Sequence, residues 1–162
     1  MLSVKIEKEL NNQLNREYFS AYLYMSMAAY FQSVDLSGFE HWMQVQAKGE
    51  LSHAEKIYDF IHERNGRVVL EQIEKPQTDW ESPLAAFEDS LKHEIFITSC
   101  INELIKATLE EKDNATEIFL QWFVTEQVEE EANAIQVIKK LKFIKDAPAG
   151  LLMLDKELAQ RS

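Results

Sequence analysis

Residues 10–31 read LNNQLNREYFSAYLYMSMAAYF and carry small or apolar side chains at helical spacing. Steps of three or four residues place these positions on one face of a helix. That face comprises Leu10, Leu14, Glu17, Ala21, Tyr24, Ala28 and Phe31. We therefore predict a helix over residues 4–33 whose inward face is apolar apart from the carboxylate of Glu17.

The same spacing recurs along the chain and predicts further helices over about residues 39–66, 83–111, 114–142 and 151–160. Local signals agree with these limits. Helix starts are predicted at the cap pairs Ser37/Glu40 and Asn114/Glu117 and at Ser82-Pro83, and a helix stop is predicted at Asn65-Gly66.

The links between these helices differ in length. Residues 67–82 can cross the whole length of a bundle, whereas the other links are short and force antiparallel neighbours. The predicted fold is therefore all-α, an antiparallel four-helix bundle with one long crossover and a short fifth C-terminal helix. With 162 residues, we expect a single domain over residues 1–162.

Composition excludes several functions. A net charge of −11 argues against nucleic acid and anionic membranes as partners and favours cations. Residues 18–34 carry no charged side chain, but they are too polar for a membrane span. The chain begins without an apolar signal segment, and its single Cys100 fits a reducing compartment, so we expect a cytoplasmic protein.

At one level of the predicted bundle, the inward faces of the helices carry polar side chains. Four glutamates replace a hydrophobe near the middle of four different helices: Glu17, Glu50, Glu94 and Glu130. The midpoints of antiparallel helices meet at one height, so we expect these carboxylates to converge. His53 follows one turn after Glu50, and Gln127 lies one turn before Glu130.

Charge balance favours a metal site at this level. Buried carboxylates repel one another and lose their hydration. No Lys or Arg occupies a comparable inward position, whereas two divalent cations would balance four negative charges. Oxygen donors with one imidazole suit iron or manganese, and pairs of metals about 3.5–4 Å apart occur in redox and hydrolytic sites. The alternative is a misjudged helix phase, but four coincident interruptions favour the metal site.

Three segments resemble the non-haem ferritins of bacteria and archaea: LNREYFSAYLY (14–24), ELSHA (50–54) and WFVTEQVEEE (122–131). The resemblance extends over essentially the whole chain. Bacterioferritins and rubrerythrins carry a second Glu-x-x-His where this chain has Gln127-x-x-Glu130. Bacterioferritins also place a haem-ligating methionine where this chain has Leu51, so haem is not expected.

The resemblance implies a di-iron ferroxidase centre within each bundle. One iron would be held by Glu17, Glu50 and His53, and the other by Glu94 and Glu130. In this pattern Glu50 bridges the two irons, and Gln127 is a neighbouring hydrogen-bonding group. Tyr24 and Trp122 match aromatic positions that lie close to the centre and can donate electrons, with ordinary core packing as the alternative for both.

Related bacterial ferritins often have a third iron site, to which Glu126 and Glu129 correspond. The glutamate that the family usually places directly before the bridging residue is Gly49 here. This difference removes a ligand, and glycine within a helix costs roughly 1 kcal/mol relative to alanine. We therefore expect a weak third site or none, in which case Glu126 and Glu129 are solvated acids.

The function implied by the resemblance is iron storage. Fe(II) would be oxidised by O2 or H2O2 and kept as a ferric mineral inside a homo-oligomeric shell of twenty-four subunits, without nucleic acid or membrane as a partner. A di-iron oxidase or peroxidase without a storage role is the main alternative, although the missing second Glu-x-x-His and the fifth helix argue against it. A DNA-protecting mini-ferritin and a metal-free helical interaction protein are two others.

Overall fold

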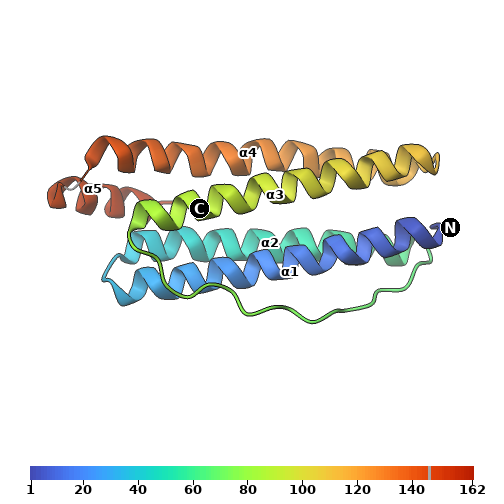
Figure 1. Ribbon diagram of the computed structural model, residues 1–162, viewed down its shortest axis with the longest axis horizontal. Helices are drawn as coiled ribbons and strands as arrows, with labels where there is room; N and C mark the ends of the chain where they lie inside the picture. Colours follow the sequence, from blue (N-terminus) through green and yellow to red (C-terminus); the bar gives the residue numbers. More distant parts are fainter. Residues whose placement is uncertain (146) are drawn as a thin grey trace.

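The computed structural model describes residues 1–145 and 147–162, and over this range it contains helices and no strand. The helices are α1 (Val4–Ser33), α2 (Ser37–Glu63), α3 (Pro83–Glu110), α4 (Asn114–Ile144) and α5 (Pro148–Leu158). In Figure 1, α1 lies beside α2 and α3 beside α4, and the link from α2 to α3 runs along the bundle. The predicted all-α bundle with one crossover and a fifth helix is confirmed. None of the described helices is both long and apolar enough to cross a membrane.

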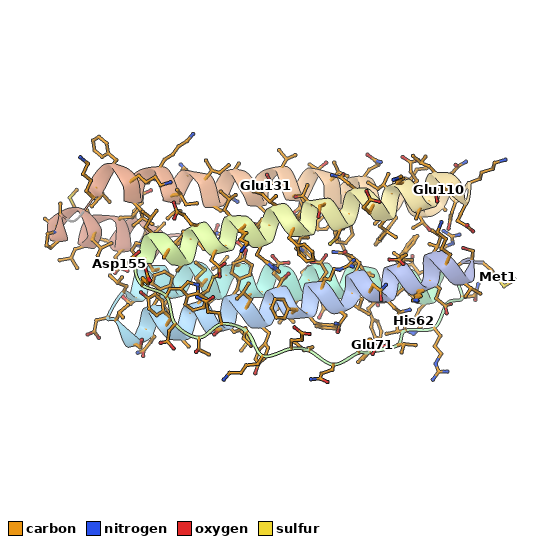
Figure 2. All side chains as sticks on the ribbon, in the orientation of Figure 1. Met1, His62, Glu71, Glu110, Glu131 and Asp155 are labelled. Carbon is orange, nitrogen blue, oxygen red and sulfur yellow. The ribbon has the colours of Figure 1, made fainter. Side chains whose placement is uncertain are left out.

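The start of α2 is stabilised by a residue of α5, and the predicted capping box there is wrong. The helix begins at Ser37 without a side-chain cap of its own. Instead, Asp155 accepts hydrogen bonds from the backbone N–H groups of Gly38 (2.8 Å) and Phe39 (3.1 Å). A Cβ at Gly38 would lie 1.7 Å from the backbone oxygen of Asp155. Glycine therefore allows α5 to pack closely against the start of α2, at the end of the bundle where Figure 2 labels Asp155.

The other helix ends follow local chemistry more closely. The cap at Ser82 is confirmed, since its hydroxyl accepts the backbone N–H three residues later at 3.1 Å. The predicted cap at Asn114 is wrong, because Asp113 caps α4 by accepting from the N–H of Thr116. After α2, Asn65 adopts a left-handed conformation with φ of 57°, which ends the helix. At α5, the helix begins earlier than predicted because Pro148 suits the first helical position.

Two apolar clusters form the core, one towards each end of the bundle. The first includes Phe31, Phe39 and Phe87, and the second includes Leu10 and Ile57. Each of the four long helices contributes to both clusters and changes from one to the other near its middle. The buried polar side chains at these middle positions form a layer between the two clusters.

Candidate metal centre

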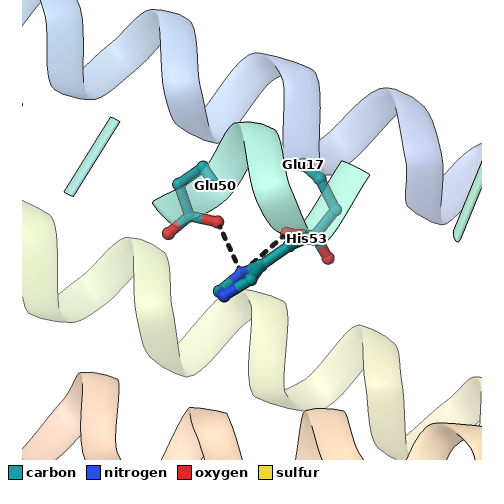
Figure 3. A group of neighbouring side chains, drawn as sticks. All are labelled: Glu17, Glu50 and His53. Carbon is teal, nitrogen blue, oxygen red and sulfur yellow. Dashed lines mark hydrogen bonds and ion pairs between the residues drawn. The ribbon is translucent and has the colours of Figure 1, made fainter. Parts of the chain in front are cut away.

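Glu17, Glu50 and His53 lie together in the polar layer. Their exposed fractions are 1%, 2% and 4%, and one ligand atom of each lies within 4.8 Å of the other two. Glu50 and His53 share a face of α2 because they are three residues apart. Figure 3 shows the imidazole facing both carboxylates: His53 Nδ1 lies 3.2 Å from Glu50 Oε2 and 3.8 Å from Glu17 Oε2. This geometry suits a cation held between two helices.

The carboxylate of Glu17 is only half satisfied. Its Oε1 accepts a hydrogen bond from Gln13 Nε2 at 2.6 Å, whereas its Oε2 is buried and has no hydrogen-bond partner among the described residues. Burial and the neighbouring charge of Glu50 raise the pKa of Glu17 to about 8. Burial, Glu94 and Glu130 raise the pKa of Glu50 well above its usual range. These ionised carboxylates are therefore costly without a cation, and an orphaned oxygen beside an imidazole nitrogen fits a metal-binding site.

Glu94 enters the same layer from α3, with an exposed fraction of 2%. The Tyr24 hydroxyl donates to Oε1 of Glu94, and Gln127 Nε2 donates to Oε2 at 3.0 Å. Tyr24 also lies 3.1 Å from the Ser90 hydroxyl oxygen. Burial raises the pKa of Glu94 to about 7, although both donors favour the ionised form. Tyr24 and Gln127 thus fix the direction of this carboxylate from two sides.

Glu130 completes the layer from α4 and is partly exposed. Its Oε2 accepts a hydrogen bond from Gln46 Nε2. Ligand atoms of His53, Glu126 and Glu130 form a second group within 4.8 Å of one another, and Glu126 Oε2 lies 3.9 Å from His53 Nε2. Glu126 therefore borders the centre, whereas Glu129 is exposed.

Two further predicted positions have distinct surroundings. Around Gly49, an added Cβ would meet no atom within 4 Å, so the helix face here has room for a larger side chain. Trp122 is 37% exposed, and its ring lies 5.4 Å from the ring of His53. The Lys56 ammonium lies 4.5 Å from the centre of the Trp122 ring. Trp122 is therefore at the edge of the centre and is not a fully buried core aromatic.

The structure brings the predicted acids into one layer, and it adds residues to which sequence reasoning gave no role. Gln13 and Gln46 hydrogen-bond Glu17 and Glu130, and Arg161 hydrogen-bonds Gln46. A signal for the glutamines was present, since each lies one turn before a glutamate of the layer. Nothing local marks Arg161, whose side chain reaches α2 only through the packing of α5.

In the part of the chain that the structure describes, no lysine or arginine pairs directly with the four glutamates. Within residues 1–145 and 147–162, the ion pairs that involve lysine or arginine all lie elsewhere. Oxygen-rich donors with one imidazole, largely buried between four helices and without a direct lysine or arginine partner among the described residues, suit divalent cations of the iron type. The fold and this site define the class of protein: a four-helix bundle whose polar middle layer is a candidate site for divalent metal ions.

Comparison with known proteins gives the family. The family model described as a ferritin-like domain matches residues 7–144, and the chain belongs to the ferritin family. The bacterial non-heme ferritin of Bacteroides fragilis (strain 638R) is 39% identical, over 99% of this chain and 100% of that protein. The bacterial non-heme ferritin of Staphylococcus epidermidis (strain RP62A) is 41% identical, over 100% and 98%. The predicted resemblance to the non-haem ferritins is confirmed.

Solved structures agree with the sequence relatives. A structure described as a novel open pore ferritin from the hyperthermophilic archaeon Archaeoglobus fulgidus has 51% sequence identity and a TM-score of 0.99, with 100% of both chains covered. A closed form of Archaeoglobus fulgidus ferritin, engineered by site-directed mutagenesis, has 52% identity and a TM-score of 0.99, and the match covers 100% of this chain and 99% of that one.

Proposed function

We propose that this chain is an iron-storage ferritin that oxidises Fe(II) at a di-iron centre within each subunit. The Fe(III) is then kept as a mineral inside a hollow homo-oligomer of twenty-four subunits. The observation that carries the proposal is the buried Oε2 of Glu17, which has no hydrogen-bond partner among the described residues and lies beside the Nδ1 of His53. No described lysine or arginine pairs with the acids of this layer. The non-heme ferritin names of relatives that match over the full chain support the storage role.

The substrate irons would be held by residues from all four long helices. Glu17, Glu50 and His53 Nδ1 would hold one Fe(II), and Glu94 and Glu130 would hold the second. Glu50 would bridge them, as the family resemblance implies. In agreement with this, the charges of Glu94 and Glu130 are close enough to Glu50 to help raise its pKa. Tyr24 and Gln127 would orient Glu94, and Tyr24 is also the electron donor that the family resemblance implies.

Oxidation at this centre follows from the ligand chemistry. Anionic oxygen ligands stabilise Fe(III) relative to Fe(II) and so favour the loss of an electron. Two adjacent irons supply two electrons together, which matches the reduction of O2 to H2O2 or of H2O2 to water with two protons taken up. Because carboxylates bind metal in their deprotonated form, Fe(II) must displace the protons that burial favours on Glu17 and Glu94.

Two measurements on the purified protein test the proposal. Size-exclusion chromatography with light scattering gives the assembly mass, and aerobic additions of Fe(II) give the oxidation rate and the amount of iron kept in solution. We expect a large shell, oxidation much faster than in a protein-free control, and soluble iron far beyond two per chain. Fast oxidation by a small oligomer that lets ferric hydroxide precipitate would instead indicate an oxidase without a storage role. Oxidation no faster than in the control would refute the proposal.

A further inference from the structure

Glu17 is connected to an arginine through a glutamine. Gln13 has an exposed fraction of 0%, and its Nε2 donates to Glu17 Oε1 at 2.6 Å. On the other side of the amide, Gln13 Oε1 accepts from the Arg16 guanidinium at 3.2 Å. These three residues lie within two turns of α1, so the connection is local.

The same arrangement recurs at Glu130 with residues from three different elements. Gln46 of α2 has an exposed fraction of 2%, and its Nε2 donates to Glu130 Oε2 of α4. Its Oε1 accepts from the guanidinium of Arg161 at 2.7 Å. Two carboxylates of the layer, those of Glu17 and Glu130, thus each accept a hydrogen bond from a glutamine. Each glutamine in turn accepts a hydrogen bond from an arginine.

Arg161 is itself held in place by α2. His41 Nε2 donates to the backbone oxygen of Arg161 at 2.7 Å. The guanidinium lies 4.0 Å from the centre of the Trp42 ring and donates to the Trp42 backbone oxygen at 3.3 Å. Contacts on the backbone, on the face of the guanidinium and on its edge define its orientation relative to Gln46.

An arginine in this position determines the orientation of the glutamine amide group. A guanidinium has hydrogen-bond donors only, so the amide oxygen must face it. The amide nitrogen then faces the carboxylate and donates to it. The glutamine amide lies between the arginine and the glutamate, so it also keeps the guanidinium from pairing directly with the carboxylate. A direct pair would occupy both carboxylate oxygens and neutralise the charge that a metal requires, whereas here the carboxylate is oriented and stays free to bind a cation.

We infer that Arg161 and Arg16 are positioning residues of the metal centre, which act through Gln46 on Glu130 and through Gln13 on Glu17. The inference rests on the proposed function, because it assumes that the layer binds two metal ions. The two arms act on different ions: Arg161 affects the ion held with Glu130, and Arg16 affects the ion held with Glu17 and His53.

The role of Gln46 and Gln13 is tested by anaerobic titration of the metal-free assembled protein with Co(II). Binding is monitored by the visible absorption of the bound Co(II). Gln46→Met and Gln13→Met keep the side-chain length but remove the donor. Losing a partner that orients a metal ligand typically costs 10–100-fold in affinity. We therefore expect one of the two bound Co(II) ions to bind roughly tenfold more weakly in each variant. Its absorption bands should change, and the affected ion should differ between the two variants.

A matched control exists on the same helix. Gln44 Nε2 donates to Glu40 Oε1 on an exposed face, so Gln44→Met removes the same kind of hydrogen bond away from the centre. This variant should bind both Co(II) ions with wild-type affinity and absorption. If Gln46→Met and Gln13→Met also titrate like the wild type, the inference is wrong.

Whether Arg161 acts through Gln46 is tested by combining substitutions at the two positions. If Arg161 acts on the metal through Gln46, the double variant Arg161→Met/Gln46→Met should bind Co(II) no more weakly than Gln46→Met alone. Arg161→Met by itself should weaken the same ion, and Arg67→Met, at an exposed arginine, should weaken neither. Additive losses would show that Arg161 acts only by holding α5 in place. A wild-type protein that fails to bind two Co(II) ions would refute the proposed function itself, and this inference with it.

Discussion

The two halves of the candidate centre solve the problem of buried charge differently. In the sealed half, formed by Glu17, Glu50 and His53, one buried carboxylate oxygen has no hydrogen-bond partner within residues 1–145 and 147–162. In the open half, formed by Glu94 and Glu130, neutral donors contact both carboxylates, and Glu130 is partly exposed. The difference indicates that the sealed half depends on a cation for its charge balance, whereas the open half is oriented before any cation arrives.

Glu50 is the residue that joins the two halves, so replacing it should have the largest effect. In Glu50→Ala, both irons of the proposed centre would lose a ligand, and the negative charge between them would disappear. We expect the initial rate of Fe(II) oxidation to fall on the order of 100-fold, measured by stopped-flow absorbance. The apolar clusters on either side are untouched, so the assembly should elute like the wild type. Glu55→Ala, at an exposed position of the same helix, is the control. Rapid oxidation by Glu50→Ala would disprove its bridging role.

Replacing a glutamate by the isosteric glutamine should change stability in opposite directions in the two halves of the centre. Glu17→Gln removes a carboxylate whose pKa is raised to about 8, and the new amide nitrogen can donate to Glu50. We expect the metal-free protein to become more stable at pH 7, by roughly 2 kcal/mol per subunit. Glu94→Gln should destabilise it, because Glu94 accepts from Tyr24 and Gln127, and an amide nitrogen cannot accept. Denaturation of the metal-free variants provides the measurement. Equal shifts of one sign in both would contradict the contrast.

Acid–base behaviour should reflect the buried carboxylates of both halves, since the pKa is raised for Glu17 in the sealed half and for Glu94 in the open half. Glu17 provides the test. The pKa of the Glu17 carboxyl rises from its ordinary value of 4.5 to about 8 in the folded protein, chiefly because the group is buried. Between these values, the folded metal-free protein retains a proton that the unfolded chain has released, so stability should fall as pH rises through this window. Metal binding must displace the proton. Calorimetric Zn(II) titrations in buffers of different ionisation enthalpy should therefore show proton release near pH 7, and weaker binding as pH falls. Glu17→Gln should release fewer protons, and release equal to the wild type would argue against Glu17 as a ligand.

The smallest expected change is the addition of a carboxylate next to Glu50, the residue that joins the two halves. Gly49→Glu places a carboxylate where a Cβ meets no atom within 4 Å, on the helix that carries Glu50. Together with Glu126, which lies beside His53, it should raise the number of tightly bound Fe(II) per chain from two to three in an anaerobic titration. Gly49→Gln has the same length without the charge and should leave the number at two. An unchanged stoichiometry in Gly49→Glu would show that this glycine is not what weakens a third site.

The sequence predicted the fold class and the acids of the centre for one reason. Glu17, Glu50, Glu94 and Glu130 interrupt periodic apolar faces, and antiparallel helices of similar length bring their midpoints to one height. Periodicity is a local signal, and it was enough here. The helices begin at Ser37 and Asn114, but the capping roles predicted for these two residues were wrong. A cap pattern does not reveal whether another side chain caps the helix instead.

Tertiary contacts account for what the sequence could not show. Asp155 caps α2 although it lies 117 residues after Gly38, and this depends on how α5 packs. Arg161 reaches Gln46 by the same packing. The exposure of Glu130 and Glu129 could not be read from spacing either, because it depends on the rotation of α4 within the bundle. Local patterns thus identified the charged residues of the layer, and three-dimensional packing determined their partners.

A crystal structure of protein soaked anaerobically with Fe(II) tests the central claim most directly. Anomalous scattering should show two irons in the polar layer, one bound by Glu17, Glu50 and His53 Nδ1, and the other by Glu50, Glu94 and Glu130. The unpartnered Oε2 of Glu17 should lie within bonding distance of the first iron. A layer without iron, or with these carboxylates turned to solvent or paired with lysine or arginine, would contradict the proposal that cations neutralise the interior of this bundle.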